Sequence, residues 1–405
     1  MNPARESHLM FAALRHCKNE IEIPELDIRV RRFKMESKNG YLQHGGKPCC
    51  PIHGYEFPVS ASRFHHETNQ LADALIPENL SFAYFMVTSR PIPAKPARGV
   101  ILLFHGLNEK SWQKYLPWAL RLHRGTGKPV ILFPLAFHMD RAPAEWIEPR
   151  SMQVLSRERA ARHPAIHAHS LANAAISERL EADPRRFAWS GLQSLYDLFD
   201  LCRRIRAGLH PGILPNPRID LFAYSIGAFL ALIAIMTNPG NIYSTSRLFC
   251  FCGGCVLNRT NPTSRYIMDS EATIALYAMY VEYLETEIRT NPRLAHFISS
   301  MHPEGMFFRS LLDLNQMAEF RDLRLHQLRS RIRALVLKRD LVIPPLEVIY
   351  TLQGRHRKIP IRIRQTDFPY PYTHENPFPL QSSHSGQVTR MMDRTMAGAS
   401  RFLSH

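Results

Sequence analysis

The segment Ile219-Asp220-Leu221-Phe222-Ala223-Tyr224-Ser225-Ile226-Gly227-Ala228 decides the fold. Its first six residues are typical of a buried strand, and an apolar helix follows over residues 227–236. Ser225 therefore lies at a strand-to-helix turn, with a small residue two positions away on each side. Small residues are needed there because a tight turn brings the strand and the helix close together. The segment predicts a serine presented for chemistry at the end of a core strand.

Strands and helices alternate outward from this turn. We expect strands at residues 81–88, 100–104, 129–133, 219–224, 247–256, 332–337 and 359–365. We expect helices at residues 111–123, with Ser111 as the cap, and at 192–205, 227–236 and 387–403. This alternation predicts an α/β fold with a mostly parallel central sheet and helices on both faces.

The pattern divides the chain into an N-terminal part and a main domain, and two insertions interrupt the main domain. Residues 1–98, with a helix near 7–18 and a strand near 26–33, form an N-terminal extension and the first strands of the sheet. Residues 99–405 form the main α/β domain. The insertions 137–189 and 258–330 follow the carboxyl ends of core strands, where α/β sheets bind ligands. They predict a helical cap over Ser225.

Composition and charge exclude several other classes of protein. The chain has 45% hydrophobic residues, enough for a large core, and a net charge of +16 from 51 basic and 35 acidic residues. Its basic residues are scattered and no nucleic-acid module is present, so we predict no nucleic-acid partner. The longest charge-free apolar stretch, residues 221–236, is too short to span a bilayer. The N-terminal residues lack the apolar run of a secretory signal, which predicts a cytoplasmic location.

The turn at Ser225 resembles the nucleophile elbow of the α/β-hydrolase superfamily, with Ala223 in place of the usual glycine. In that superfamily an acid follows a later strand and a histidine follows the last strand. Asp340 comes directly after the strand at 332–337, and His374 follows the strand at 359–365. The resemblance implies that Ser225 is the nucleophile, His374 its general base and Asp340 the acid that orients the histidine.

Two positions of this assignment have alternatives in the sequence. Asp269 or Glu271 could supply the acid instead of Asp340. His384, in the segment Ser382-Ser383-His384-Ser385-Gly386, could be the base instead of His374. We favour His374 because it comes sooner after the strand.

The resemblance also implies an oxyanion hole and a pocket. The segment His105-Gly106-Leu107-Asn108 resembles the superfamily's His-Gly signature, so the amides of Leu107 and Ile226 are the expected donors. His105 would support this loop at the edge of the pocket. Phe137, His138 and Trp146 either line the substrate pocket or only pack the insertion against the sheet.

The implied activity is that of a serine hydrolase that cleaves a carboxylic ester or thioester of a small-molecule acyl substrate through an acyl-enzyme. The resemblance extends to an uncharacterised bacterial branch, through residues 134–143 and 373–379, and implies no known substrate. The alternative is a binding protein that keeps the fold without catalysis. The oligomeric state stays open.

Cysteines and histidines offer weak signals of a metal site. The seven cysteines are an odd number without a spaced framework, which indicates reduced thiols. Cys250, Cys252 and Cys255 lie in an apolar strand and are best explained by burial. The segment Cys49-Cys50-Pro51-Ile52-His53 is a comparably weak metal candidate, and the 20 histidines include no HExxH or paired-histidine pattern. We therefore predict no metal and no cofactor.

Overall fold

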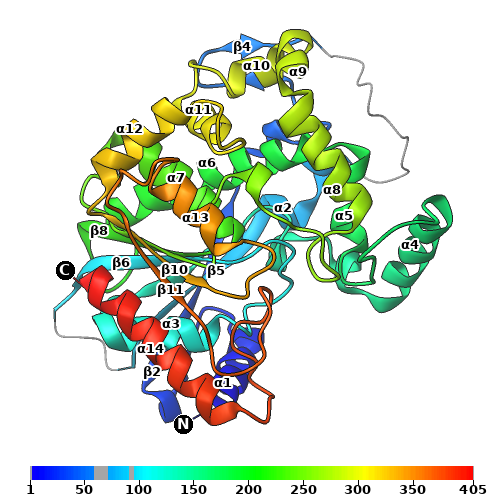
Figure 1. The fold of residues 1–405 in the computed structure, drawn as a ribbon. Helices are drawn as coiled ribbons and strands as arrows, with labels where there is room; N and C mark the ends of the chain where they lie inside the picture. The colour runs from blue at the N-terminus through cyan, green and yellow to red at the C-terminus, as the bar shows by residue number, and fades with distance from the viewer. Residues whose placement is uncertain (1, 59–71, 91–94, 405) are drawn as a thin grey trace.

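The computed structural model describes residues 2–58, 72–90 and 95–404, and its centre is a nine-stranded sheet (Figure 1). The strand order is β1-β2-β5-β7-β6-β8-β9-β10-β11. These strands span Glu20–Ile23 (β1), Ile28–Glu36 (β2), Ser81–Ser89 (β5), Ala97–Phe104 (β6), Val130–Leu132 (β7), Ile213–Tyr224 (β8), Leu248–Phe251 (β9), Ile332–Leu337 (β10) and Arg362–Thr366 (β11). A separate hairpin pairs β3 (Cys49–Cys50) with β4 (Tyr55–Glu56).

Most of the sheet is parallel, which confirms the predicted fold class. All pairings from β7 through β11 are parallel, whereas β1, β2 and β5 pair in antiparallel fashion and extend one side of the sheet. The residues before Gly99 therefore supply three strands and the start of β6. Because β6, β8, β9, β10 and β11 are parallel, the loops that follow them meet at one edge of the sheet.

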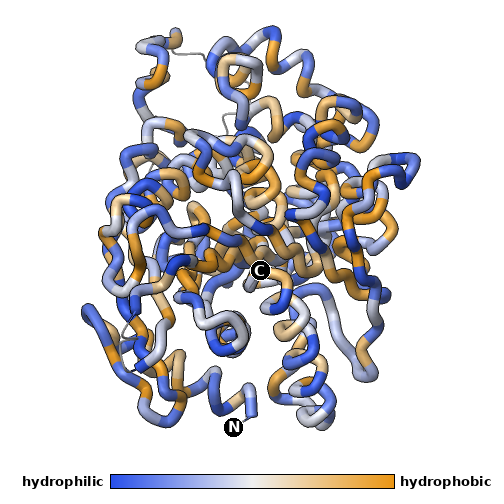
Figure 2. Tube along the Cα trace, turned by 90° about the vertical axis from the view of Figure 1, so that its left-hand side faces the viewer, coloured by the Kyte–Doolittle hydropathy of each residue, from blue (hydrophilic) through white to orange (hydrophobic). Residues whose placement is uncertain are grey.

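Helices cover both faces of the sheet (Figure 1). Alternate residues of β6 point to opposite faces, so Leu102 belongs to one core cluster and Leu103 to the other. One face carries α1 (Pro3–His16), α3 (Leu116–Thr126) and α14 (Ser385–Ser404), and the other carries α6 (Arg186–Arg206), α7 (Ile226–Thr237) and α13 (Pro345–Leu352). Figure 2 shows the hydrophobic segments gathered in the middle layer of the molecule.

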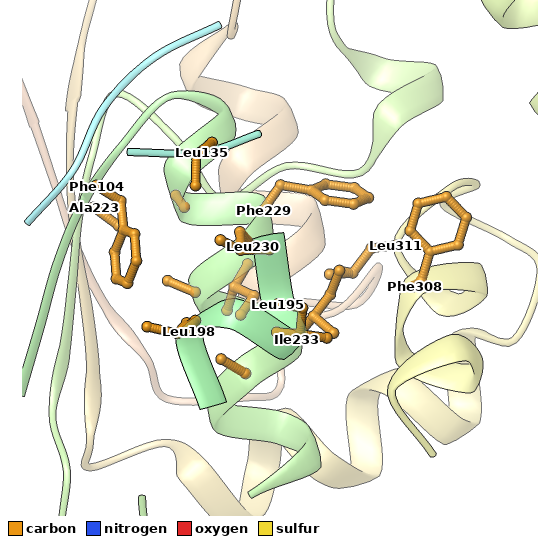
Figure 3. Close-up of a cluster of buried hydrophobic side chains, with 14 of the residues drawn as sticks. Phe104, Leu135, Leu195, Leu198, Ala223, Phe229, Leu230, Ile233, Phe308 and Leu311 are labelled. Atoms are coloured by element: carbon orange, nitrogen blue, oxygen red, sulfur yellow. The ribbon is translucent and has the colours of Figure 1, made fainter. Parts of the chain in front are cut away.

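Helix α7 is the most buried of the helices that pack with α6 and α13 on one face of the sheet. It carries no charged residue, and its ten residues from Gly227 to Met236 are all buried. A helix that is apolar on all sides must be surrounded by protein. In Figure 3 its side chains Phe229, Leu230 and Ile233 lie among residues of α6 and of α11 (Pro303–Ser310). The helix that follows Ser225 is therefore held rigidly from several sides.

Some predicted element boundaries are wrong. Helix α3 begins at Leu116 and not near Ser111, because the Ser111 hydroxyl accepts a hydrogen bond from the amide of Gln113 (3.1 Å) in a local turn. Strand β9 ends at Phe251, since the backbone turns sharply at Cys252 (φ 47°). Helix α1 begins four residues before its predicted start.

The two predicted insertions are helical and contact the loop after β6. The first contains α4 (Pro149–Arg162), α5 (Ala174–Ala182) and the start of α6, and the second contains α8 (Ser270–Tyr277), α9 (Leu284–Thr290), α10 (Pro292–Phe297), α11 and α12 (Ala318–Leu328). Asn108 Nδ2 donates to the carbonyls of Ala172 (2.9 Å) and Tyr266 (2.8 Å), one in each insertion. Among the helices of the described residues, none combines the length and the apolarity that spanning a bilayer needs.

A buried ion pair joins the N-terminal segment, the first insertion and α6. The Arg141 guanidinium lies 2.7 Å from Asp197 Oδ2, and neither side chain is exposed. Asp197 Oδ1 also accepts hydrogen bonds from Ser37 Oγ (2.7 Å) and Asn39 Nδ2 (2.8 Å). One carboxylate of α6 thus satisfies donors from two other parts of the chain.

We predict that Asp197→Ala lowers the free energy of unfolding by about 3–5 kcal/mol, because it leaves the Arg141 charge buried without a partner. Urea denaturation of the purified variant measures this. Asp200→Ala on the same helix is the matched control: Asp200 pairs with the exposed Arg203 and accepts only a long hydrogen bond from Asn39 (3.3 Å), so its loss costs less than about 1 kcal/mol. Equal losses of unfolding free energy in the two variants would contradict the role of Asp197 as the buried partner of Arg141.

Candidate active site

Ser225 occupies a strained turn between β8 and α7. Its backbone φ of 56° and ψ of −125° are rare for a residue with a side chain, and such strain costs of order 1–3 kcal/mol. The neighbouring glycines make room for the turn. A Cβ atom at Gly227 would lie 2.7 Å from the carbonyl oxygen of His105, and one at Gly253 would lie 2.9 Å from the carbonyl oxygen of Ser225. The turn therefore depends on close backbone packing.

Ser225, His374 and Asp340 form a continuous chain of hydrogen bonds. Ser225 Oγ lies 2.7 Å from His374 Nε2, and His374 Nδ1 lies 2.8 Å from Asp340 Oδ2. All three residues are buried, although their loops follow three different strands. In this arrangement the serine hydroxyl can pass its proton to an imidazole whose other nitrogen faces a carboxylate.

The surroundings fix the carboxylate and the imidazole. Asp340 Oδ1 accepts hydrogen bonds from the amides of Val342 (3.0 Å) and Ile343 (2.9 Å), which hold its other oxygen toward the histidine. The His374 ring stacks on Tyr224 with a centroid distance of 5.4 Å. The Tyr224 hydroxyl also donates to the main-chain carbonyl of His374. Rotation of either side chain would break several contacts.

The sequence alternatives for the acid and the base lie in other environments. Asp269 caps α8 and pairs with the buried Arg159 at 2.8 Å. Glu271 accepts a hydrogen bond from Ser270 in the first turn of the same helix. His384 is half-buried just before α14 and contacts Ser383. None of the three has a hydrogen bond to Ser225 or His374 among the described residues.

The backbone amides of Leu107 and Ile226 are the donors expected for an oxyanion hole. The Ile226 amide is the first of α7, at the positive end of the helix dipole. Leu107 and Ile226 line the same cavity as Ser225. Within the described residues neither amide donates a hydrogen bond to protein. Two backbone donors are thus free to bind an oxygen atom near Ser225.

His105 supports the Leu107 loop and does not line the cavities around Ser225. It is fully buried, and burial holds the pKa of its imidazole well below the usual value. The neutral ring uses both nitrogens: Nε2 accepts from the Leu135 amide (3.0 Å) and Nδ1 donates to the Gly106 carbonyl (2.8 Å). His105 therefore positions backbone and has no free nitrogen for substrate.

Two cavities that share four lining residues lie near the turn between β8 and α7. The smaller contains Ser225 itself, and the larger is mostly apolar. Leu107, Phe187, Ile226 and Phe229 line both of them. The larger is also lined by Leu135, Ala136, Phe137, His138, Trp146, Ile176, Leu180, Gly191, Leu192, Leu195, Leu230, Ile233 and Phe308, and by the polar residues Arg179, Arg186, Ser190, Ser194 and Glu304.

The other three predicted pocket residues all line this larger cavity. Phe137 stacks on Trp146 with a centroid distance of 6.1 Å. Burial lowers the pKa of His138 to about 3, so its imidazole is neutral. Its Nδ1 donates to the Ala136 carbonyl (2.8 Å), while Nε2 has no hydrogen-bond partner among the described residues. His138 thus adds one unpaired polar atom to an apolar wall.

A polar cleft lies on the other side of Leu107. Its walls include Lys110, Lys114 and Glu375. Burial lowers the pKa of the Lys110 ammonium to about 8. Lys114 pairs with Glu109 and also donates to the Glu375 carbonyl (2.8 Å), next to His374. The apolar cavity and this charged cleft share Leu107 in their walls.

Sequence reasoning missed two tyrosines that support the site. Tyr115 accepts a hydrogen bond from the Gly106 amide (2.9 Å), and Tyr224 holds His374 as described above. The position of Tyr224 directly before the serine could have indicated it. Tyr115 carries no comparable signal, because its contact depends on how α3 packs against the loop.

Comparisons with known proteins match the whole chain to one family. Residues 5–404 match the model described as "Family of unknown function (DUF6051)". No curated protein matches the sequence.

Several solved structures resemble this chain at low sequence identity. A thermostable esterase from Pseudomonas putida has 11% identity and a TM-score of 0.42, with 100% of this chain and 91% of that chain covered. Carboxyl esterase 2 from Tuber melanosporum has 9% identity and a TM-score of 0.43, covering 79% and 81%. Acylaminoacyl peptidase from Pyrococcus horikoshii has 12% identity and a TM-score of 0.43, covering 80% and 40%.

The close packing at the serine turn predicts opposite effects for two glycines. Gly227→Ala should lower the free energy of unfolding by about 1–3 kcal/mol, because the added methyl group meets backbone that cannot move. Gly398→Ala in α14, where an added Cβ has no atom within 4 Å, should raise it by about 0.5–1 kcal/mol. Urea denaturation measures both, and a neutral Gly227→Ala would show that the turn is not constrained.

Proposed function

We propose that this chain, which belongs to the family DUF6051, is a serine hydrolase that cleaves a carboxylic ester or thioester of a small-molecule acyl substrate. The observation that carries the proposal is the hydrogen-bonded chain from Ser225 through His374 to Asp340, with distances of 2.7 and 2.8 Å. It begins at a strained serine at the end of a core strand.

The proposed reaction has two steps of the same kind. Ser225 Oγ attacks the carbonyl carbon of the substrate while its proton moves to His374 Nε2. The imidazolium then gives this proton to the departing alcohol or thiol, which leaves an acyl group on Ser225. Water attacks the acyl-enzyme with His374 again accepting the proton, and the acid product is released. Asp340 keeps the imidazole in the right tautomer and stabilises its charged form.

The negative charge on the substrate oxygen needs donors that are already in place. We assign this role to the amides of Leu107 and Ile226, since neither has a partner among the described residues. A preorganised donor of this kind contributes about 3–4 kcal/mol to stabilising the transition state. The buried His105 and Tyr115 hold the loop that carries Leu107.

The two sides of the site suggest how the substrate lies. The apolar cavity suits the hydrocarbon part of an acyl group, and the polar cleft with Lys110 and Lys114 suits a polar leaving group. Helices α5 and α6 and the loop near Tyr266 line these spaces, so we propose that the insertions form the cap that selects the substrate. A displaced Asp340 would favour a binding protein without catalysis; its 2.8 Å contact with His374 supports the hydrolase.

A fluorophosphonate probe should add once to the full-length protein, at Ser225, because the probe reacts with serines activated by a base. Intact mass and peptide mapping measure the labelling. Ser225→Ala and His374→Ala should abolish it, whereas His384→Ala should label like the wild type. Absence of labelling in folded wild-type protein, or unchanged labelling of His374→Ala, would contradict the proposal.

The larger cavity should set the length of the acyl chain. Gly191 lies on its wall, and a Cβ added there meets no atom within 4 Å. Gly191→Leu should therefore fill space and reduce kcat/KM for long-chain esters relative to short ones by about fourfold for each excluded methylene. Gly191→Ala is the control and should keep the wild-type preference. A chain-length profile shared by all three proteins would show that acyl groups bind elsewhere.

A further inference from the structure

Four side chains that have no role in the proposed reaction lie close together in the structure. They are Cys50 and His53 in the β3–β4 hairpin, His296 in α10 and His302 directly before α11. One potential ligand atom from each lies within 4.8 Å of all the others. Figure 1 shows β4 beside α10. Two segments far apart in sequence, residues 50–53 and 296–302, therefore bring one thiol and three imidazoles together.

Three of the six separations between these atoms are close to those of a tetrahedral metal centre. Ordinary zinc bond lengths place two nitrogen ligands about 3.3 Å apart, and a sulfur and a nitrogen ligand about 3.6 Å apart. Here His53 Nδ1 and His296 Nε2 are separated by 3.1 Å. Cys50 Sγ lies 3.5 Å from His53 Nδ1 and 3.4 Å from His302 Nε2. An ion could bind among these four atoms with little movement of the backbone.

The outer contacts of His302 are those of a metal ligand. Its Nε2 faces the cluster, and its Nδ1 lies 3.1 Å from Glu304 Oε1 and 3.0 Å from the Tyr196 hydroxyl. Tyr196 in turn donates to Glu304 at 2.5 Å. A carboxylate that accepts the Nδ1 proton fixes the tautomer in which Nε2 carries a lone pair for a metal. Cys50 and His302 are almost fully buried, which protects such a centre from water.

We propose that Cys50, His53, His296 and His302 bind a structural zinc ion. One thiolate and three imidazoles are a ligand set that zinc prefers, and four protein ligands fill its tetrahedron. No position is left for a water molecule or a substrate, so the ion holds the hairpin to α10 and α11. Binding releases the Cys50 thiol proton to solvent.

The prediction of no metal is not supported here: it was based on the absence of an HExxH or paired-histidine pattern, and these four residues form no such pattern in the sequence. The missing ligands lie 243 residues after His53 and 252 residues after Cys50. Only the fold brings them to the hairpin. Cys250, Cys252 and Cys255, by contrast, are buried free thiols as predicted, and burial raises the pKa of Cys250 to about 12.

The zinc centre also adjoins the proposed acyl cavity. Glu304, which holds His302, lines that cavity together with Phe308 of the same helix. Loss of the ion would therefore loosen one wall of the cavity while leaving the Ser225 turn intact. The zinc site and the hydrolase activity can be tested independently, because metal content does not depend on whether Ser225 reacts.

The test is metal content of the full-length protein, purified without an affinity tag that binds metal. Elemental analysis after dialysis should give one zinc per chain. Replacement by cobalt(II) should give the absorption of a tetrahedral site with a thiolate charge-transfer band. Cys50→Ser should abolish that band, and Cys49→Ser is the matched control that should keep it, since Cys49 is the neighbouring thiol outside the cluster.

His53→Ala covers the case in which Cys50→Ser does not fold, because His53 is exposed in the hairpin turn. It should weaken zinc binding at least tenfold in competition with a chromophoric chelator, and Glu304→Gln should weaken it about 10–100-fold. Folded wild-type protein without stoichiometric zinc would overturn the proposal. So would equal zinc content and an equal thiolate band in Cys50→Ser and Cys49→Ser.

Discussion

The close approach of β8, α7 and the neighbouring loops at Ser225 is the constraint on which the rest of the site depends. The serine can adopt φ 56° because Gly227 lies against the backbone of His105 and Gly253 lies against the backbone of Ser225. In this turn the Ser225 hydroxyl contacts His374, and the Ile226 amide lies at the start of α7. The all-apolar α7 anchors the turn, since it is buried among α6 and α11.

From this turn the parallel sheet determines where the other groups lie. The loops after β6, β8, β10 and β11 meet at one edge, so Leu107, Ser225, Asp340 and His374 come together although they span most of the chain. The helical insertions add the walls of the two cavities and the cleft. The N-terminal residues are joined to this frame through Asp197.

Much of this arrangement could be predicted from sequence, for a physical reason. Buried parallel strands are continuous apolar runs, and the order of the serine, acid and histidine follows the order of the strands. The ends of some elements were harder to predict. The Ser111 hydroxyl accepts a hydrogen bond within a local turn and does not cap α3, and the backbone turns at Cys252, which ends β9. Contacts that depend on tertiary packing, such as Tyr115 with Gly106 or Cys50 with His302, leave no local pattern.

The central claim is that Asp340 activates Ser225 through His374, and the most direct test is the rate at which Asp340→Asn reacts with a fluorophosphonate. An amide retains the shape of the carboxylate but neither fixes the tautomer nor stabilises the imidazolium. The account predicts that the second-order rate of labelling falls by about 10³–10⁴-fold while the stability of the protein changes little. Labelling of Asp340→Asn at the wild-type rate would contradict it.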